Sequence, residues 1–229
     1  MRKRNKLAKI TWFGHAAFKI EIANKTVLID PWLDGNPTSP VKSSEITQAD
    51  IVYVTHDHTD HLGGAFNICK RTNATFVAVI DLAACAKNEG VNKIEGLNIG
   101  GTVDVKGVKL TMVQAFHTAI KGVPTGVVVE GEGKTVYHAG DTGIFGDMRL
   151  IGEIYNPEVA LIPIGGYYTM DAKQASEAVK LLNPKVVIPM HYKTFPVLAQ
   201  SPDKFVKYVN EKAPQVKIVV LKAGEAYQF

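Results

Sequence analysis

The strongest constraint in this sequence is a run of histidines and aspartates that directly follows a short apolar segment. The segment Ile51-Val52-Tyr53-Val54 has the composition of a buried strand, and Thr55-His56-Asp57-His58-Thr59-Asp60-His61 comes after it. Such an H-x-H-x-D-H spacing is expected by chance on the order of once in several thousand chains of this composition. The fold therefore has to place this loop at a strand end, where imidazole and carboxylate groups can meet.

The spacing within the loop suggests two metal positions rather than one. Alternate side chains of a loop that leaves a strand can aim at one point, which His56 and His58 would share. Asp60 and His61 would then aim at a second point a few ångströms away. Imidazole and carboxylate ligands suit zinc and neighbouring divalent metals.

Three further residues occupy positions that could complete these sites. His117, Asp141 and His191 each come just after the end of a predicted strand. In α/β folds, ligands gather at the edge where strands end, so we expect all three beside the histidine loop. A lone histidine at such a position is more often a hydrogen-bonded structural residue, and it is the neighbouring cluster that favours a ligand role here.

The chain repeats one order of elements: a group of strands, then alternating strands and helices. This order predicts an α/β architecture with two packed sheets and helices on the outer faces. No internal repeat, low-complexity tract or linker interrupts it, so we expect one domain over 1–229. The predicted strands lie near 8–13, 17–22, 26–30, 51–54, 75–79, 102–105, 108–115, 126–131, 134–138, 159–163, 186–189 and 216–221, and the predicted helices near 62–71, 81–89, 171–182 and 202–212.

Cysteine usage and hydropathy indicate a cytoplasmic protein. The two cysteines, Cys69 and Cys85, form no C-x-x-C pair, as is usual in a reducing compartment. No run approaches the roughly 20 apolar residues that span a bilayer. The basic start followed by an apolar stretch superficially resembles a signal peptide, but that stretch is short and contains His15, and Lys19 follows at once.

The net charge of +4 is weak evidence for a nucleic-acid partner. Four cations, Arg2, Lys3, Arg4 and Lys6, lie within the first six residues, and the rest of the chain sums to zero. A nucleic-acid-binding protein carries its excess cations on a folded face. We therefore expect a small-molecule substrate, no nucleic-acid partner and no membrane partner. The sequence has no periodic apolar stripe that would identify an oligomer interface, so whether the chain is a homo-oligomer stays open.

Several motifs together give the sequence a resemblance to the metallo-β-lactamase fold superfamily, nearest to uncharacterised metal-dependent hydrolases allied to the ascorbate-6-phosphate lactonases. The resemblance implies a four-layer αββα sandwich with a two-metal site between the sheet edges. By position it assigns His56, His58 and His117 to one metal, Asp60, His61 and His191 to the other, and Asp141 to both. The motifs, besides the H-x-H-x-D-H loop, are Gly14-His15-Ala16-Ala17-Phe18, Leu28-Ile29-Asp30-Pro31-Trp32, Phe116-His117, His138-Ala139-Gly140-Asp141, Pro163-Ile164-Gly165-Gly166 and Pro189-Met190-His191-Tyr192.

Departures from other branches of that superfamily narrow the function. Position 58 is His where the di-iron oxidoreductases of this fold carry an acid, which argues against redox chemistry. The chain also lacks the long insertion of the nucleases and the cysteine ligand of many secreted lactamases. RNA processing and antibiotic hydrolysis are therefore not expected.

The expected chemistry is hydrolysis by a hydroxide that two divalent ions share. The ions would lower the pKa of a bridging water towards roughly 7, and Asp60 would orient it against a carbonyl or phosphoryl centre. The ions bring +4, and Asp60, Asp141 and the hydroxide subtract three, which leaves about one positive charge and favours an anionic substrate. Zinc is the expected metal because imidazole ligands dominate, and manganese, nickel and iron stay open.

Residues around the ligands receive supporting roles. His15 is expected to face the pocket as a proton donor or anion contact, the alternative being structural packing. Asp30 should orient the histidine loop, because metal-bound imidazoles need an outer hydrogen-bond acceptor. His138 should support the Asp141 loop. Candidate substrate contacts are Tyr192 and Lys193, through a phosphate or carboxylate, with an ordinary surface position as the alternative for each. The backbone amides of Gly165 and Gly166 are further candidates, with a plain tight turn as an equal alternative.

Two other functions stay open at this point. A phosphodiesterase acting on phospholipid or nucleotide would use the same metals with an apolar or cationic groove. A non-catalytic metal-dependent binding protein would have the same fold, although such proteins usually lose one or more ligands and this chain retains all seven. A hydrolase of a small, anionic ester, lactone or phosphodiester is the leading prediction.

Overall fold

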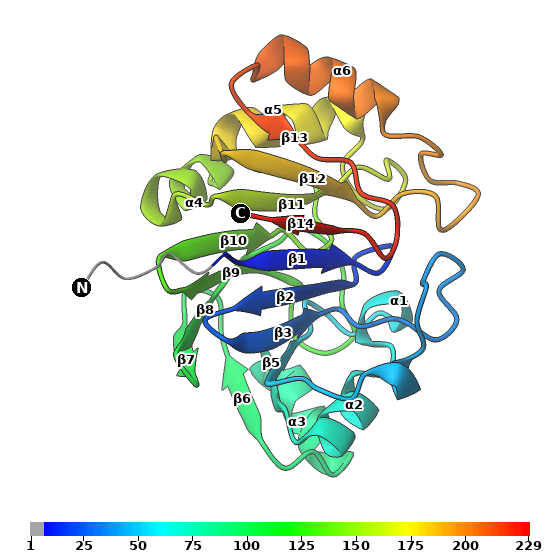
Figure 1. Ribbon diagram of the computed structural model, residues 1–229, viewed down its shortest axis with the longest axis vertical. Helices are drawn as coiled ribbons and strands as arrows, with labels where there is room; N and C mark the ends of the chain where they lie inside the picture. The colour runs from blue at the N-terminus through cyan, green and yellow to red at the C-terminus, as the bar shows by residue number, and fades with distance from the viewer. Residues whose placement is uncertain (1–6) are drawn as a thin grey trace.

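The computed structural model describes residues 7–229, and the basic residues at positions 2, 3, 4 and 6 lie outside them. Two seven-stranded sheets pack against each other, with helices on both outer sides. Figure 1 shows α4, α5 and α6 in the upper part of the molecule, near β11 and β12, and α1, α2 and α3 in the lower part, near β3 and β5. The α/β class and the four-layer sandwich are confirmed.

Each sheet has an antiparallel half and a parallel half. In the first sheet the order is β14-β1-β2-β3-β4-β5-β6, and the pairs from β3 to β6 are parallel. A parallel pair needs a long crossover, and α1 to α3 lie in the connections after β4 and β5. The strands of this sheet are Lys9–Trp12 (β1), Phe18–Ile22 (β2), Lys25–Ile29 (β3), Ile51–Tyr53 (β4), Thr75–Val79 (β5), Ile94–Leu97 (β6) and Ala226–Gln228 (β14).

The second sheet repeats this plan. Its order is β13-β12-β11-β10-β9-β8-β7, and the pairs from β10 to β13 are parallel. Strands β9 and β10 are consecutive in the chain and pair antiparallel as a hairpin. The strands are Thr102–Val105 (β7), Val108–Gln114 (β8), Thr125–Gly131 (β9), Lys134–His138 (β10), Val159–Pro163 (β11), Val186–Met190 (β12) and Lys217–Ile218 (β13).

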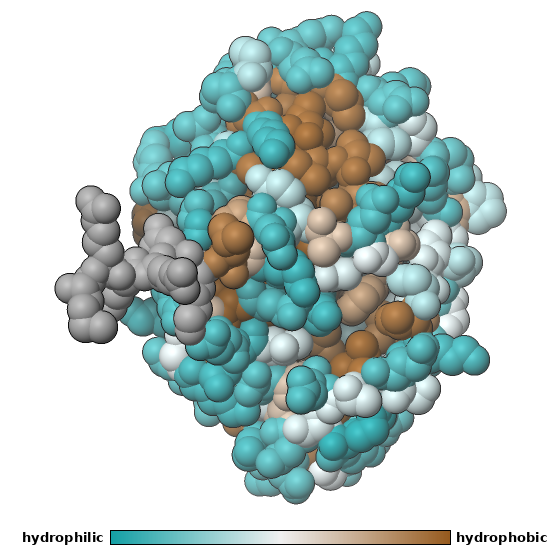
Figure 2. All heavy atoms as spheres, in the orientation of Figure 1, coloured by the Kyte–Doolittle hydropathy of each residue, from teal (hydrophilic) through white to brown (hydrophobic). Residues whose placement is uncertain are grey.

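The helices are short. Helices α2, α3 and α5 pack directly on strands, whereas α4 and α6 lie against α5. Asp171 caps α5, as its carboxylate accepts a hydrogen bond from the Gln174 amide at 2.8 Å. Figure 2 shows mostly hydrophilic residues on the visible outer surfaces of the helical layers, with hydrophobic residues between them. The helices are Thr59–Leu62 (α1), Ala65–Thr72 (α2), Ile80–Asn88 (α3), Met148–Tyr155 (α4), Ala172–Leu182 (α5) and Asp203–Lys212 (α6), with a short 3-10 turn at Ser43–Glu45 (η1).

The central strands are buried along their whole length, because one face meets the other sheet and the opposite face meets helices. Every residue of β4, β5, β11 and β12 is buried, whereas β2 alternates. One hydrophobic cluster contains residues of both sheets, which supports the proposal of a single domain. Within the described part of the chain, no helix is long and apolar enough to cross a membrane.

Several boundaries differ from the predictions. The helix expected over 62–71 is broken, because Gly63, at a φ of 42°, ends α1 and α2 begins only at Ala65. Only two residues of the strand expected over 216–221 pair with β12. The elements β6, β14 and α4 were not predicted: β6 is half exposed and lacks a strand-like pattern, and β14 exists through its pairing with the distant β1.

Candidate metal centre

The seven predicted metal ligands meet at one edge of the sandwich. The loop after β4 and helix α1 supply four of them, and the segments after β8, β10 and β12 supply the others. The loops that follow these strands reach the same edge, as expected from the strand directions. Sequence segments more than a hundred residues apart thus form one cluster.

The first group of donors is His56, His58 and His117. One nitrogen from each lies within 4.8 Å of the other two. The His56 Nε2 and His58 Nδ1 atoms are 2.9 Å apart, close to the roughly 3.3 Å that separates two nitrogens on one tetrahedral zinc ion. His56 is buried, whereas His58 and His117 are partly exposed. This group is the one expected for the first metal.

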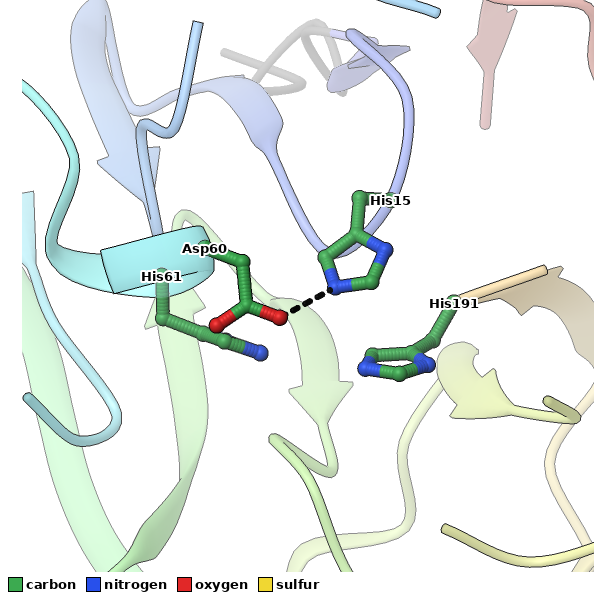
Figure 3. Close-up of side chains that lie close together, drawn as sticks. All are labelled: His15, Asp60, His61 and His191. Atoms are coloured by element: carbon green, nitrogen blue, oxygen red, sulfur yellow. Dashed lines mark hydrogen bonds and ion pairs between the residues drawn. The ribbon is translucent and has the colours of Figure 1, made fainter. Parts of the chain in front are cut away.

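The second group contains Asp60, His61 and His191, with His15 beside them (Figure 3). His61 projects from α1, and His191 comes directly after β12. The His15 Nε2 atom lies 3.2 Å from Asp60 Oδ2, and the His15 and His191 rings are 3.8 Å apart between centroids. The three residues expected for the second metal are therefore brought together.

Asp141 lies between the two groups. Its Oδ2 atom is 3.0 Å from His191 Nε2, 3.3 Å from His61 Nε2 and 3.6 Å from His117 Nε2. It therefore contacts members of both groups, as a bridging ligand would.

The donor set fits divalent metal ions. The buried atoms His61 Nε2, His191 Nε2 and Asp141 Oδ1 make no hydrogen bond to any described residue. Unpaired polar atoms are costly in a protein interior, and three of them converge here. Imidazole nitrogens and carboxylate oxygens are ligands of zinc and related metals. We therefore expect these atoms to be satisfied by metal.

A hydrogen-bond network below the cluster sets the orientation of its histidines. The Asp30 carboxylate accepts from the Thr55 amide at 2.7 Å, from Thr55 Oγ1 at 2.7 Å and from His61 Nδ1 at 2.8 Å. Because the single Thr55 hydroxyl proton goes to Asp30, the His56 Nδ1–H donates to Thr55 Oγ1 at 3.0 Å. Both imidazoles thus turn their Nε2 atom towards the cluster, which is the nitrogen that a metal ion would take in place of a proton. Asp30 therefore orients the histidine loop by accepting hydrogen bonds behind the proposed ligands, as expected.

His138 supports two loops from inside the core. Its Nε2 contacts the Ala16 carbonyl at 3.0 Å, and its Nδ1 accepts from the Gly140 amide at 3.1 Å. Gly140 has a φ of 62°, and a Cβ there would lie 2.4 Å from the Thr125 carbonyl oxygen, so only glycine fits this turn. His138 therefore fixes the Asp141 loop without facing the metal cluster.

Three residues of the site adopt a left-handed backbone that is unusual for residues other than glycine. The φ angles are 52° at His15, 47° at Asp30 and 57° at His191. Each such residue costs on the order of 1–3 kcal/mol, and residues of this kind gather at functional sites. The surrounding fold holds all three side chains in place.

The charges of the cluster are strongly coupled. Burial and the neighbouring His61 lower the pKa of His56 to about 2. Burial alone would raise the pKa of Asp141, but His191 and His61 outweigh it and hold that pKa well below its usual range. Burial would lower the pKa of His61, but Asp141 and Asp30 raise it well above the ordinary value. The cluster thus already favours positive charge between these carboxylates.

A pocket of about 680 Å³ opens over the two groups of donors. Five metal-ligand candidates form its floor, and apolar and hydroxyl side chains form its walls. Among the described residues, no lysine or arginine lines it. The lining residues are Trp32, His58, Thr59, Asp60, His117, Thr118, Asp141, Tyr168, His191, Phe195, Pro196 and Val197.

The predicted substrate contacts lie elsewhere. Tyr192 is buried and stacks on Trp12 at 5.4 Å between ring centroids, and the exposed Lys193 does not line the pocket. The Gly166 amide already donates to the Met170 carbonyl. A Cβ on Gly165 would lie 2.5 Å from the His191 carbonyl oxygen, so this glycine gives His191 room. None of these four residues lines the pocket, and their roles as substrate contacts stay predictions.

His15 also has a different position from the one expected. It is fully buried behind Asp60 and does not line the pocket. Its Nδ1 atom lies 2.5 Å from Thr194 Oγ1. Trp32 ends the Leu28-Ile29-Asp30-Pro31-Trp32 motif, but no local signal in the sequence marks Thr194 or the pocket aromatics Tyr168 and Phe195.

Known proteins are similar to this chain over most of its length. A family profile described as a β-lactamase superfamily domain matches residues 9–191. The chain is 50% identical over 229 residues to a UPF0173 metal-dependent hydrolase of Methanopyrus kandleri, which covers 96% of this chain and 99% of that protein. It is 47% identical over 218 residues to one from Caldivirga maquilingensis, which covers 94% of this chain and 96% of that protein.

A solved structure is also similar over nearly the whole chain. Igni18, a metallo hydrolase from the archaeon Ignicoccus hospitalis, is 42% identical, with a TM-score of 0.91 and coverage of 98% of this chain and 99% of that one. Fold, site and similarity together define a metal-dependent hydrolase. The chain belongs to the β-lactamase superfamily, among the UPF0173 metal-dependent hydrolases.

Proposed function

We propose that this hydrolase uses a binuclear metal site to cleave a small, anionic ester, lactone or phosphodiester. His56, His58 and His117 would hold one ion, Asp60, His61 and His191 the other, and Asp141 would bridge them. When bound, two divalent ions supply a water nucleophile of lowered pKa and polarise the bond under attack. Zinc is the proposed metal, and manganese, nickel and iron are the alternatives.

One observation carries the proposal: Asp141 Oδ2 lies within 3.6 Å of a nitrogen from His61, His117 and His191. The two other donor groups lie on either side of it. A single ion would leave one of these groups without a partner. The buried, unpaired nitrogens of His61 and His191 support the same reading.

Thr194 and His15 position the carboxylate of Asp60, the proposed acceptor of the proton from the attacking water. Burial and His191 lower the pKa of His15 to about 4, so its imidazole is neutral at pH 7. Thr194 Oγ1 would donate to His15 Nδ1, and His15 Nε2–H then donates to Asp60 Oδ2. Asp60 keeps its other oxygen for the attacking water or a metal. His15 is therefore proposed as a positioning residue, and Asp60 as the catalytic one.

The proposal is tested by assaying the metal-loaded protein on matched lactones, thioesters, carboxylic esters and phosphodiesters. We expect turnover of at least one class, lost in Asp60→Asn, with the metal retained at no less than one ion per chain. Asp57→Asn is the matched control, because Asp57 lies in the same loop but its carboxylate accepts from the Ile120 amide at 2.8 Å. If the protein binds two ions but hydrolyses none of these substrate classes, it would instead be a non-catalytic metal-dependent binding protein.

We also propose a cytoplasmic location, a small-molecule substrate, and no nucleic-acid or membrane partner. The two free cysteines, Cys69 and Cys85, support a reducing compartment. Self-association is open, and size-exclusion chromatography with light scattering measures it directly. Fractionation of cells that produce the tagged chain tests the location.

A further inference from the structure

The part of the pocket that does not bind metal is aromatic and apolar. Trp32, from the loop after β3, and Phe195, after β12, stack with ring centroids 5.9 Å apart and planes 23° from parallel. Both rings meet His15 edge-on, at 5.2 and 5.5 Å. Because His15 also contacts Asp60 and His191, this wall is held at a fixed place beside the second group of donors.

Exposed apolar side chains continue this wall towards the solvent. Val197 is 52% exposed and Tyr168 is 53% exposed, and both line the pocket. Tyr168 is held by an edge-on contact with Tyr167 at 4.9 Å. Large apolar side chains left in water around a concave site mark a place where a ligand's apolar part is buried.

The pocket offers nothing to a second charged group on a substrate. Among the lining residues, the charged or ionisable ones are the proposed ligands and Tyr168, and the other polar ones are the hydroxyls of Thr59 and Thr118. A substrate with a distal phosphate or carboxylate would bury that charge without a cation, which is costly. The anionic part of the substrate therefore belongs at the metals, and the rest of it has to be uncharged.

From these observations we propose that the substrate carries an aromatic group, which the wall of Trp32, Phe195 and Val197 holds beside the reacting centre. The inference rests on the proposed function, because it places the anionic or ester group at the metals. A flat ring suits this wall because offset stacking on Trp32 or Phe195 adds to the gain from burial. The substrate class is thus aryl esters, aryl lactones or aryl phosphodiesters, in preference to alkyl ones.

The test compares two probes that differ only in this group. Phenylphosphonate and methylphosphonate are titrated calorimetrically into the full, metal-loaded chain. We expect about tenfold tighter binding of phenylphosphonate, the size of one good aromatic contact plus its burial. Equal affinities, or no binding of either probe to protein with its metals in place, would overturn the proposal.

Variants locate the effect on the wall. Phe195→Leu keeps an apolar side chain but removes a ring, and Val197→Ser changes only the half-exposed mouth. Each should weaken phenylphosphonate binding several-fold and leave methylphosphonate unchanged. Val220→Ser is the control, since Val220 is 45% exposed and does not line the pocket. An equal loss for both probes, or the same loss in Val220→Ser, would contradict an aromatic subsite.

Hydrolysis assays distinguish a failure of the aromatic subsite from a failure of the proposed function. If phenylphosphonate is preferred but no ester or phosphodiester is cleaved, the proposed function fails and the subsite stands. If aryl and alkyl esters are cleaved with the same kcat/KM and the two phosphonates bind equally, the function stands and the subsite fails.

Discussion

The inner and outer parts of the metal centre are built differently. The inner donors His61, His191 and Asp141 are buried, and Asp30 holds His61 from behind. The outer donors His58 and His117 are partly exposed at the pocket. The packing of the chain thus holds the inner donors in place, whereas we expect metal binding to order the outer ones. Changes to the inner donors should cost stability as well as metal, and changes to the outer ones should cost metal alone.

The largest expected effect comes from Asp141→Ala, because this residue contacts both parts. Removing a residue that only hydrogen-bonds to a metal ligand costs a metal enzyme roughly 10–100-fold in activity. Removing a bridging ligand should cost more, so turnover should be abolished. Steady-state kinetics at saturating metal measure this effect. Retained activity would contradict a two-metal mechanism.

His117→Ala should separate metal loss from stability. We expect a loss of more than about 100-fold in kcat/KM, because one ligand of the outer group is removed. In chelator, however, its unfolding free energy should differ from wild type by less than about 1 kcal/mol, as for other partly exposed positions. A large loss of stability without metal would show that the outer donors are also part of the folded framework.

Asp30→Asn should show the opposite behaviour. Asparagine tolerates the left-handed backbone at this position, so the change removes mainly the charge that holds His61. Breaking a buried ion pair lowers the free energy of unfolding by about 3–5 kcal/mol, so the melting temperature measured in chelator should fall by roughly 10 °C. Activity should fall about 10–100-fold. An unchanged melting temperature in chelator would remove the distinction between inner and outer donors.

Thr194→Val is expected to have the smallest effect. It removes the hydroxyl that contacts His15 Nδ1 but keeps the shape of the side chain. Without this partner the His15 imidazole is no longer held with Nε2–H towards Asp60. We expect kcat to fall about tenfold, the smallest loss usual for a residue that hydrogen-bonds to a metal ligand or its neighbour. Thr194→Ser should restore most of the rate. If valine and serine lower kcat equally, the hydroxyl does not position His15.

That these seven side chains lie close together could be predicted from the sequence, because the signal is local. Four donors lie within six residues, and the other three directly follow apolar strands whose ends meet at one edge. The positions of Tyr192 and Lys193 were not predictable in the same way, since the turn after β12 contains two left-handed residues, His191 and Lys193, and neither Tyr192 nor Lys193 lines the pocket. Trp32 and Phe195 lie 163 residues apart and meet only through the packing of the two sheets.

The same reasoning explains the fold. Strands such as β11 and β12 are buried on both faces and appear as continuous apolar runs. Strand β14 has no such pattern, because its middle residue is only partly buried and its place depends on pairing with β1. Gly63 and Gly64 separate α1 from α2 inside a segment whose apolar period looks like one helix.

The number of metal ions bound per chain decides whether the seven residues hold two ions. Protein purified without chelator or nickel resin is analysed for its elements, with Asp141→Ala and Asp57→Asn prepared in parallel. The account predicts close to two divalent ions in the wild type and in Asp57→Asn, and fewer in Asp141→Ala. Little or no metal in the wild type, with no uptake after zinc or manganese is added, would contradict it.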